Sequence, residues 1–340
     1  MFYSALLQHS GTFIRITLSK NTTQDEALRI SQMTIALPFL LPLCYTDGKG
    51  GELVRKKRIK IVLLVLCTAL VLAAVLSLVL SRYALSVSEY TVSSERIEAP
   101  MRVVQLSDLH NCTFGKGNAR LIGRILALEP DIVVMTGDMC TCSVEDVRVP
   151  LALTEELSKH VPVYFAMGNH EISHEEHFST DLQGRFQAAG ATVLDDAFLE
   201  IECNGNDLRI GGWYGYCLKP TSKVWIQEEQ DFLSAFGDTE RFRLLLSHHP
   251  EGTMLWGGID EREIELVLSG HIHGGVVRLP WIGALYAPDQ GWFPECTEGM
   301  MEGAGGAAIL SRGLGTGTFI PRFCNVPEIV CVDLVPEETL

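Results

Sequence analysis

The sequence predicts an α/β fold preceded by one transmembrane helix, and three observations lead to this prediction. From residue 101 onward, short apolar stretches alternate with stretches whose apolar residues follow helical spacing. Several of the apolar stretches end at an Asp, Asn or His, and ligands of α/β sheets bind beyond the carboxyl ends of the strands. Before this region, residues 61–80 form an apolar run without a charged residue.

The composition narrows the class of protein. The 340 residues are 47% hydrophobic, which is typical of a globular chain, and the formal net charge is −15. This charge argues against a general nucleic-acid-binding protein, which would present a basic surface to phosphates. A phosphorylated substrate is still compatible, because bound cations reverse the local field. We assign no disulfide to the ten cysteines and expect most of them to be buried apolar residues.

The run at 61–80 predicts a retained membrane anchor. A helix of this length, rising about 1.5 Å per residue, spans a hydrocarbon core of about 30 Å. The alternatives are a buried core helix and a cleaved signal sequence, but a signal sequence has a shorter apolar region and a small-residue cleavage site. Residues 55–58 and Lys60 are basic and precede the run, whereas only Arg82 closely follows it. The positive-inside rule therefore predicts an extracytoplasmic domain after residue 90.

The boundaries of the other elements follow from local patterns. Residues 131–136 are predicted to form a strand buried on both faces, because residues 132–135 are a continuous apolar run. Residues 118–128 have apolar side chains at helical spacing, with Asn118 suited to the N-cap and Pro130 ending the helix. The same reasoning predicts strands at 86–92, 103–107, 161–167, 192–194, 198–202, 208–213, 243–247 and 263–269, and helices at 151–160, 181–189 and 228–236.

The chain is expected to contain four segments. Residues 1–54 carry no readable motif and have no assigned role. Residues 55–82 form the transmembrane anchor with its basic flank, and residues 83–99 form a linker with a first strand. Residues 100–340 form the main α/β domain.

Five short motifs at the ends of predicted strands carry the candidate chemistry. They are Asp108-x-His110, Gly137-Asp138, Gly168-Asn169-His170-Glu171, His248-His249 and Gly270-His271-x-His273-Gly274-Gly275. Each is of limited specificity alone, but their carboxylate, amide and imidazole groups together suffice for two divalent cations. Two metal ions a few ångströms apart form a centre that cleaves phosphoesters. The candidate metal ligands are Asp108, His110, Asp138, Asn169, His248, His271 and His273.

Spacing and chemistry indicate roles within these motifs. D-x-H and H-x-H would each place two side chains on the same side of an extended backbone. Asp138 has two carboxylate oxygens and is the candidate to bridge the metals. His170 would lie beside the metals without binding them, where a histidine suits a general acid that protonates the leaving oxygen.

The remaining histidines near these motifs are interpreted more simply. Of the adjacent His248 and His249, only one is expected to point into the site, and His248 is nearer the strand end. His174 and His177 lie in an acidic stretch and are expected to be exposed loop residues.

The motif order D-x-H, G-D, G-N-H-[DE], H, G-H-x-H resembles that of the calcineurin-like metallophosphoesterases, over roughly residues 98–335. Residues 309–315, 321–323 and 327–329 resemble its membrane-associated bacterial branch, of the YkuE and YaeI type. The resemblance implies a four-layer α/β/β/α sandwich, so that residues 100–340 would be a metallophosphoesterase domain. It also implies two divalent ions, and a mixed nitrogen and oxygen ligand set suits Mn, Fe or Zn.

The resemblance implies a division of the ligands between the two metals. One metal would be held by Asp108, His110, Asp138 and His273, and the other by Asp138, Asn169, His248 and His271. His170 matches the general acid of the family, and a metal-bridging hydroxide would attack phosphorus in line with the leaving oxygen. Asp138 and His170 are therefore the catalytic candidates.

Two positions depart from the pattern of the family. After Gly137-Asp138 the chain continues with Met139, Cys140 and Thr141, without the further Asp or the D-R-G of protein phosphatases. This argues against a Ser/Thr protein phosphatase. Val276 stands where this branch often has Gln, so a polar contact near the site is missing.

The leading hypothesis is a membrane-anchored hydrolase of a phosphomonoester or phosphodiester, with lipid-linked and envelope-derived phosphoesters among the candidate substrates. The alternative enzyme, a UDP-2,3-diacylglucosamine pyrophosphate hydrolase of lipid A synthesis, needs a cytoplasmic site, whereas the flanking charges predict an outward one. A catalytically idle receptor or scaffold would be expected to lose ligands, and none is lost. A structural metal domain would use closed, cysteine-rich sites, which do not match this ligand set.

Overall fold

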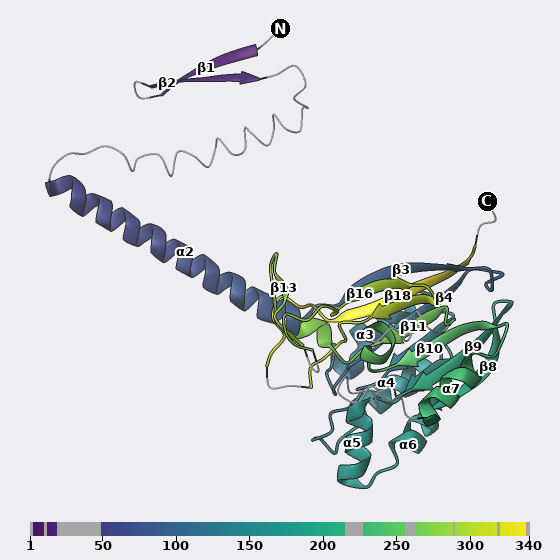
Figure 1. Cartoon of the computed structure of the whole chain (residues 1–340). Coiled ribbons are helices and arrows are strands. Elements are labelled where there is room, and N and C mark those ends of the chain that lie inside the picture. The colour runs from purple at the N-terminus through teal and green to yellow at the C-terminus, as the bar shows by residue number, and fades with distance from the viewer. Residues whose placement is uncertain are drawn as a thin grey trace. The chain divides into compact units, whose positions relative to one another are not determined.

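The computed structural model describes residues 3–9, 12–18, 49–214, 227–255, 263–287, 290–317 and 320–337. The chain divides into two compact units, Met1–Leu72 and Ala73–Leu340. The first unit contains an antiparallel hairpin of β1 (Tyr3–His9) and β2 (Thr12–Leu18), and most of the long helix α2 (Lys49–Tyr83). The second unit contains the last turns of α2 and every later element (Figure 1).

Helix α2 contains the predicted anchor. Among the residues described, the portion Val54–Tyr83 is long and apolar enough to cross a membrane. None of its apolar window is buried, whereas the core helix of a soluble domain would be mostly covered. The basic residues 55–58 and Lys60 are part of this helix and precede its apolar run.

The second unit is built on two mixed sheets of six strands each. The first sheet has the order β3-β18-β4-β5-β6-β7, in which β4 to β7 are parallel and β18 is antiparallel to β4. Its strands are β3 (Ser86–Ser94), β4 (Met101–Leu106), β5 (Ile132–Thr136), β6 (Val163–Ala166), β7 (Ala191–Leu194) and β18 (Glu328–Pro336). All five residues of β5 are buried, as expected for a central strand covered on both faces.

The second sheet has the order β16-β17-β11-β10-β9-β8, in which β9, β10, β11 and β17 are parallel. Its strands are β8 (Ala197–Cys203), β9 (Asn206–Trp213), β10 (Phe242–Ser247), β11 (Leu266–Ser269), β16 (Gly299–Gly303) and β17 (Gly306–Leu310). Between β11 and β16 the chain forms two small hairpins, from β12 (Arg278–Leu279) with β13 (Gly283–Ala284) and from β14 (Tyr286–Ala287) with β15 (Gly291–Trp292).

Three apolar clusters show how the layers pack. One lies between the sheets and joins residues such as Val103 and Val134 to Leu244 and Leu266. A second packs the first sheet against α3 (Ala119–Leu126), α4 (Arg148–Ser158) and α6 (Leu182–Ala188). A third packs the second sheet against α7 (Gln227–Gly237). Helices, two sheets and a further helix stack as four layers (Figure 1), which confirms the predicted α/β/β/α sandwich.

The structure adds elements that the patterns did not predict. Strands β16, β17 and β18 complete the two sheets, and β18 pairs along its whole length with β3. Helix α5 (Asn169–Phe178) begins within the Gly-Asn-His motif. The expectation that His174 is an exposed loop residue is wrong, because His174 is fully buried in α5 and its Nδ1 lies 3.0 Å from Thr180 Oγ1. His177 is exposed, but it also belongs to the helix.

Candidate metal centre

The loops that follow β4 and β5 are joined by backbone hydrogen bonds. The N–H of Asp108 donates to the Gly137 carbonyl at 3.0 Å, and the N–H of His110 donates to the Asp138 carbonyl at 3.0 Å. The N–H of Asn111 donates to the Met139 carbonyl at 3.2 Å. The pairing of the two strands therefore continues past their carboxyl ends and brings the first two motifs together.

We had expected extended backbone at the D-x-H and H-x-H motifs, but five of the seven candidate ligands have left-handed backbone. The φ angles are +52° at Asp108, +46° at His110, +55° at Asp138, +71° at His271 and +53° at His273. The expected arrangement of D-x-H and H-x-H on extended backbone is therefore wrong. Left-handed conformations cost about 1–3 kcal/mol for residues other than glycine, and they occur preferentially at functional sites.

Asp138 is the central carboxylate of the cluster. Its Oδ2 lies 3.3 Å from His248 Nε2, 3.6 Å from His110 Nε2 and 3.9 Å from His170 Nε2. Its Oδ1 accepts the backbone N–H of His170 at 2.9 Å, which fixes the plane of the carboxylate. One oxygen thus faces imidazoles from three different loops, as a bridging ligand requires.

The first group of candidate ligands is compact and buried. One ligand atom from each of Asp108, His110, Asp138 and His273 lies within 4.8 Å of the others. The Asp108 carboxylate accepts the backbone N–H of His271, at 3.0 Å to Oδ1 and 3.2 Å to Oδ2. Nε2 of His110 and Nδ1 of His273 are buried without a hydrogen-bond partner. Buried polar atoms normally have partners, so these two nitrogens fit a divalent cation.

The second group is centred on His248. Nδ1 of His248 donates to the Thr136 carbonyl at 2.7 Å, which leaves Nε2 to face Asn169 Oδ1 at 3.1 Å. Such a carbonyl contact selects the imidazole tautomer suited to metal binding. His248, His249 and His271 each place one ligand atom within 4.8 Å of the others. The expectation that only one of the adjacent histidines points into the site therefore does not hold.

Charge in the cluster also suits cations. Burial would raise the pKa of Asp138, but His248, His110 and His170 hold it well below its usual range. Burial would lower the pKa of His248, but Asp138 and Asp108 raise it to about 10, so a bound cation would have to displace the proton on Nε2. Burial lowers the pKa of His110 to about 3, so this imidazole is neutral, the form that binds metals. The buried carboxylates thus favour positive charge at the centre.

His170 differs from the other histidines of the centre in exposure. Its side chain is 17% exposed, whereas the side chains of His110 and His248 are fully buried. Its Nδ1 accepts the backbone N–H of Cys142 at 3.0 Å. The ring proton of the neutral imidazole is therefore on Nε2, which faces Asp138. The backbone contact from Cys142 was not predicted, because no side-chain pattern encodes it.

Glu171 is the main functional residue that the sequence analysis did not assign. Its carboxylate accepts three backbone N–H groups, from Asp138 at 2.7 Å, Cys140 at 2.9 Å and Gly168 at 2.9 Å. Glu171 thereby ties the start of α5 to the loop that carries Asp138. Its position as the third residue of a helix that begins after Gly168 is the signal that could have identified it.

Gly137 and Gly168 allow these loops to approach one another. A Cβ at Gly137, where φ is +85°, would lie 2.5 Å from His248 Nδ1. A Cβ at Gly168 would collide with the Asp138 carboxylate. Only glycine leaves room here for the ligands, which explains why both motifs contain it.

Asn325 supports the centre from the C-terminal part of the chain. Its side-chain amide donates to the carbonyls of His273 at 2.6 Å and Val276 at 3.2 Å, and its own side chain is buried. Its backbone N–H donates to Ser81 Oγ at 3.0 Å, in the last turn of α2. The sequence contains no pattern that would have predicted this link.

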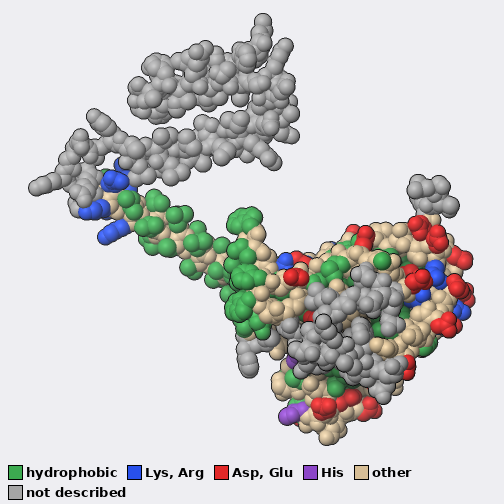
Figure 2. Space-filling view, in the orientation of Figure 1, with side chains coloured by type: hydrophobic (Ala, Val, Ile, Leu, Met, Phe, Trp, Pro, Cys, Tyr) green, Lys and Arg blue, Asp and Glu red, His purple; other side chains and the backbone are tan. Residues whose placement is uncertain are grey.

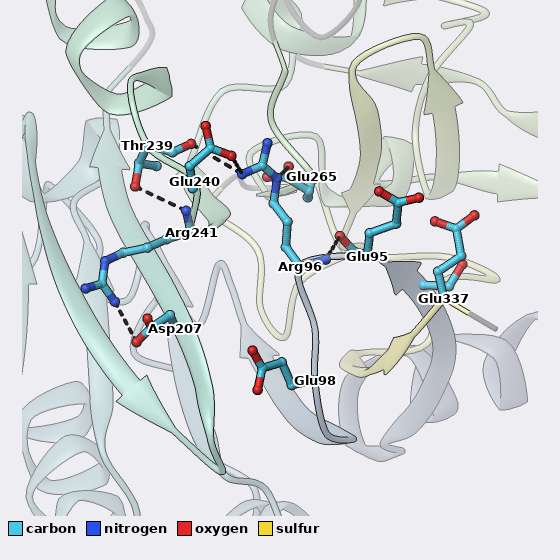
Figure 3. A pocket seen from close by; sticks show the side chains of 11 residues that line it. Glu95, Arg96, Glu98, Asp207, Thr239, Glu240, Arg241, Glu265 and Glu337 are labelled. Carbon is cyan, nitrogen blue, oxygen red and sulfur yellow. Dashed lines mark hydrogen bonds and ion pairs between the residues drawn. The ribbon is translucent and has the colours of Figure 1, made fainter. Parts of the chain in front are cut away.

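A polar groove of about 820 Å³ lies elsewhere, beside the amino ends of β9 and β10 (Figure 3). Arg96 in this groove pairs with Glu240 at 3.2 Å and Glu265 at 2.9 Å, and Arg241 pairs with Asp207 at 2.6 Å. Both arginines are therefore neutralised within the protein. The candidate ligands follow the carboxyl ends of the strands, so this groove is separate from the metal centre.

A two-sheet sandwich with buried Asp and His residues beyond the carboxyl ends of its strands defines a metal-dependent hydrolase of phosphoester bonds. A family model described as calcineurin-like phosphoesterase matches residues 101–275, and the chain belongs to this family. The enzyme class and the family predicted from the motif order are confirmed.

Several curated proteins are similar over most of their length. An uncharacterized metallophosphoesterase of Aquifex aeolicus is 29% identical, over 75% of this chain and 94% of its own. The uncharacterized metallophosphoesterase YkuE of Bacillus subtilis is 25% identical, over 75% of this chain and 87% of its own. The phosphodiesterase YaeI of Escherichia coli is 24% identical, over 70% of this chain and 83% of its own. The expected likeness to the bacterial YkuE and YaeI branch is confirmed.

Proposed function

We propose that this chain is a membrane-anchored, dimetal-dependent phosphohydrolase that cleaves a phosphomonoester or phosphodiester. The observation that carries the proposal is the convergence of residues from five separate loops around the Asp138 carboxylate. Imidazoles of His110, His170 and His248 face its Oδ2 within 3.9 Å. Only a site that binds cations gives a reason to bury so many ionisable groups together.

The proposed ligands form two sets that share Asp138. Asp108, His110, Asp138 and His273 would hold one ion, and Asp138, Asn169, His248 and His271 the other. Mixed nitrogen and oxygen ligation favours Mn, Fe or Zn over Mg or Ca. When bound, such ions supply Lewis acidity toward the phosphoryl oxygens and make water a better nucleophile.

His170 would act on the leaving group. Its Nε2 carries the ring proton, because Nδ1 accepts from Cys142, and its side chain is more exposed than the buried imidazoles around it. As a general acid His170 would act in its imidazolium form, which gives one ring proton to the departing oxygen and returns to this neutral imidazole.

Residues 61–80 would anchor the enzyme in the cytoplasmic membrane, with the catalytic domain on the extracytoplasmic side. The exposed apolar surface of α2 supports the membrane anchor. The excess of basic residues before the apolar run supports the orientation. A phosphoester in the membrane or envelope, including a lipid-linked one, would then be within reach. A relative that is named a phosphodiesterase makes diesters the first substrates to test.

The proposal is tested with the full chain in lipid nanodiscs, loaded with Mn²⁺ and offered aryl phosphomonoesters and phosphodiesters. Turnover is expected, and Asp138→Asn is expected to abolish it together with most of the bound metal. Asp146→Asn is the matched control, because Asp146 is a half-exposed loop residue that pairs with Arg148. Full metal loading without turnover of any phosphoester would favour the receptor or scaffold alternative.

The orientation has a separate test. Protease added to intact cells is expected to cleave the catalytic domain from its anchor. Protection from protease would place the domain in the cytoplasm and would favour the alternative hydrolase of UDP-2,3-diacylglucosamine.

A further inference from the structure

Exposed large hydrophobic side chains gather in one part of the second unit. Trp281 is fully exposed, Trp292 is 72% exposed and Phe293 is 67% exposed. We call this set the apolar platform; it consists of Trp281, Ile282, Tyr286, Trp292, Phe293 and Ile320. Among the described residues after Tyr83, the large hydrophobic side chains exposed outside this set are Val144 and Phe198. A patch of this kind marks an interaction surface.

Two aromatic side chains of the platform lie on a paired hairpin. Tyr286 and Trp292 are directly paired across β14 and β15, with ring centroids 5.6 Å apart. Strand β12 is joined to Phe323, whose carbonyl accepts the N–H of Arg278 at 2.9 Å. Tyr286 and Trp292 are therefore presented by paired backbone, which lowers the entropic cost of binding.

The same short segment that supports the hairpins also supports the end of α2. Next to Phe323, the N–H of Cys324 donates to Ser77 Oγ at 2.8 Å, and the N–H of Asn325 donates to Ser81 Oγ at 3.0 Å. Hydrophobic side chains gather where the last turns of α2 meet this part of the unit (Figure 2). Residues 73–80 of α2 still belong to the apolar run, so the platform adjoins the place where that run leaves the membrane.

The chemistry of the platform matches the boundary between bilayer and water. Trp and Tyr are enriched in this zone, where one part of the ring is apolar and the other can hydrogen-bond. Tyr83, which is 58% exposed and follows the apolar run, fits the same belt. The only basic residue in residues 278–293 is Arg278, which pairs with Glu298 and donates to the Gly274 carbonyl. Binding would therefore depend on apolar contact and not on anionic lipid.

We propose that the apolar platform inserts into the interfacial layer of the bilayer that α2 spans, as a second membrane contact of the catalytic unit. The lipid surface is the occupant, since the platform is continuous with the emerging end of the helix. Two contacts, the helix end and the platform, would hold the catalytic unit in one orientation on the membrane. This contact is independent of which phosphoester the enzyme cleaves.

The test uses the full chain in phosphatidylcholine nanodiscs and measures quenching of tryptophan fluorescence. Lipids with a doxyl label near the headgroup are expected to quench Trp281 and Trp292. The double variant Trp281→Phe, Trp292→Phe is expected to lose most of this shallow quenching, roughly threefold or more. Trp213→Phe, which removes a tryptophan that is 1% exposed, is the matched control and is expected to keep it. Metal content reports folding of each variant.

Three results would overturn the proposal. One is shallow quenching that is equal in wild type and double variant, with Trp281 and Trp292 instead quenched by aqueous iodide. Another is protection from iodide that depends on protein concentration, which would assign the platform to contact between copies of the chain. A requirement for anionic lipid, lost at high salt, would contradict an uncharged mode of binding. None of these readouts uses catalytic activity, so they are separable from the test of the phosphohydrolase.

Discussion

Asn325 joins the end of the apolar helix to a candidate metal ligand. Its backbone N–H donates to Ser81 Oγ, and its side-chain amide donates to the carbonyl of His273 at 2.6 Å. Because His273 has a left-handed backbone, its conformation depends on neighbours that hold its carbonyl. The position of one candidate ligand is thereby connected to the last turn of α2.

Replacement of Asn325 by Ala should weaken both stability and metal binding. The buried carbonyls of His273 and Val276 would lose their donor, at a cost of about 1–3 kcal/mol. Loss of a group that orients a ligand typically lowers metal affinity about 10–100-fold. Thermal unfolding and elemental analysis measure the two effects, with Gln187→Ala, an exposed helical amide, as control. Unchanged metal content in Asn325→Ala would contradict the supporting role.

Replacement of His170 by Ala should lower kcat by about 10²–10⁴ while metal content stays close to that of the wild type. The loss of kcat without loss of metal is expected because the proposed role of His170 is proton donation and not metal ligation. His177→Ala is the matched control, since His177 is exposed on the same helix. Loss of metal in the His170 variant would instead make His170 a ligand.

Replacement of Glu171 by Gln should destabilise the protein by about 1–3 kcal/mol. One oxygen of Glu171 accepts from Asp138 and Gly168, while the other accepts from Cys140. An amide retains a single acceptor oxygen, so its NH₂ group would face an N–H group. Denaturant unfolding of the full chain in detergent measures the loss, and Glu176→Gln, at an exposed position of α5, is the control. Equal stability of the two variants would show that the three contacts contribute little.

The Glu265 carboxylate should make stability fall in acid. Burial would raise its pKa, but hydrogen bonds from Arg243 lower it below the ordinary value of 4.5. A lowered carboxyl pKa stabilises the fold above about pH 4.5, and this contribution is lost as the pH falls through the folded pKa. The difference in unfolding free energy between metal-free wild type and Glu265→Gln should therefore shrink from pH 7 toward about pH 3.

Glu263→Gln provides the comparison for the Glu265 variant. Glu263 also approaches Arg243, at 3.6 Å, but its side chain is 80% exposed, so solvent screens the pair. Its replacement should change stability little at any pH. If the difference in unfolding free energy between wild type and Glu265→Gln is constant with pH, packing of the side chain and not its charge contributes the stability.

Much of the fold was predictable because its central strands are continuous apolar runs in the sequence. Residues 132–136 in β5 and 243–247 in β10 are buried throughout, so composition and length alone identified these strands. Strand β16 (GMMEG) was not predicted, since a short segment bounded by glycines acquires strand structure only by pairing with β17. Strand β18 (EIVCVDLVP) has the β-branched apolar residues of a buried strand, so its sequence carried a signal that our prediction did not use. Helix α5 escaped prediction because its sequence, NHEISHEEHF, has little apolar periodicity.

The candidate ligands were predictable as residue types at strand ends. The backbone conformation that orients their side chains was not predictable. Left-handed backbone at Asp108 and His273 arises from hydrogen bonds between distant loops, which a local pattern does not encode. For the same reason the contacts of Glu171 and Asn325 could be found only in three dimensions. His249 was set aside on local geometry, although the structure gathers it with His248 and His271.

The backbone pairing between the Asp108 and Asp138 loops has a consequence for how the enzyme acquires its ions. Because these bonds extend the register of β4 and β5, pairing of the two strands also brings the Asp108 and Asp138 loops together. These ligands would then be in place before an ion binds. Metal binding would follow folding of this part of the domain and would not be needed to direct it. Which ion is taken up would depend on supply in the compartment where the domain matures.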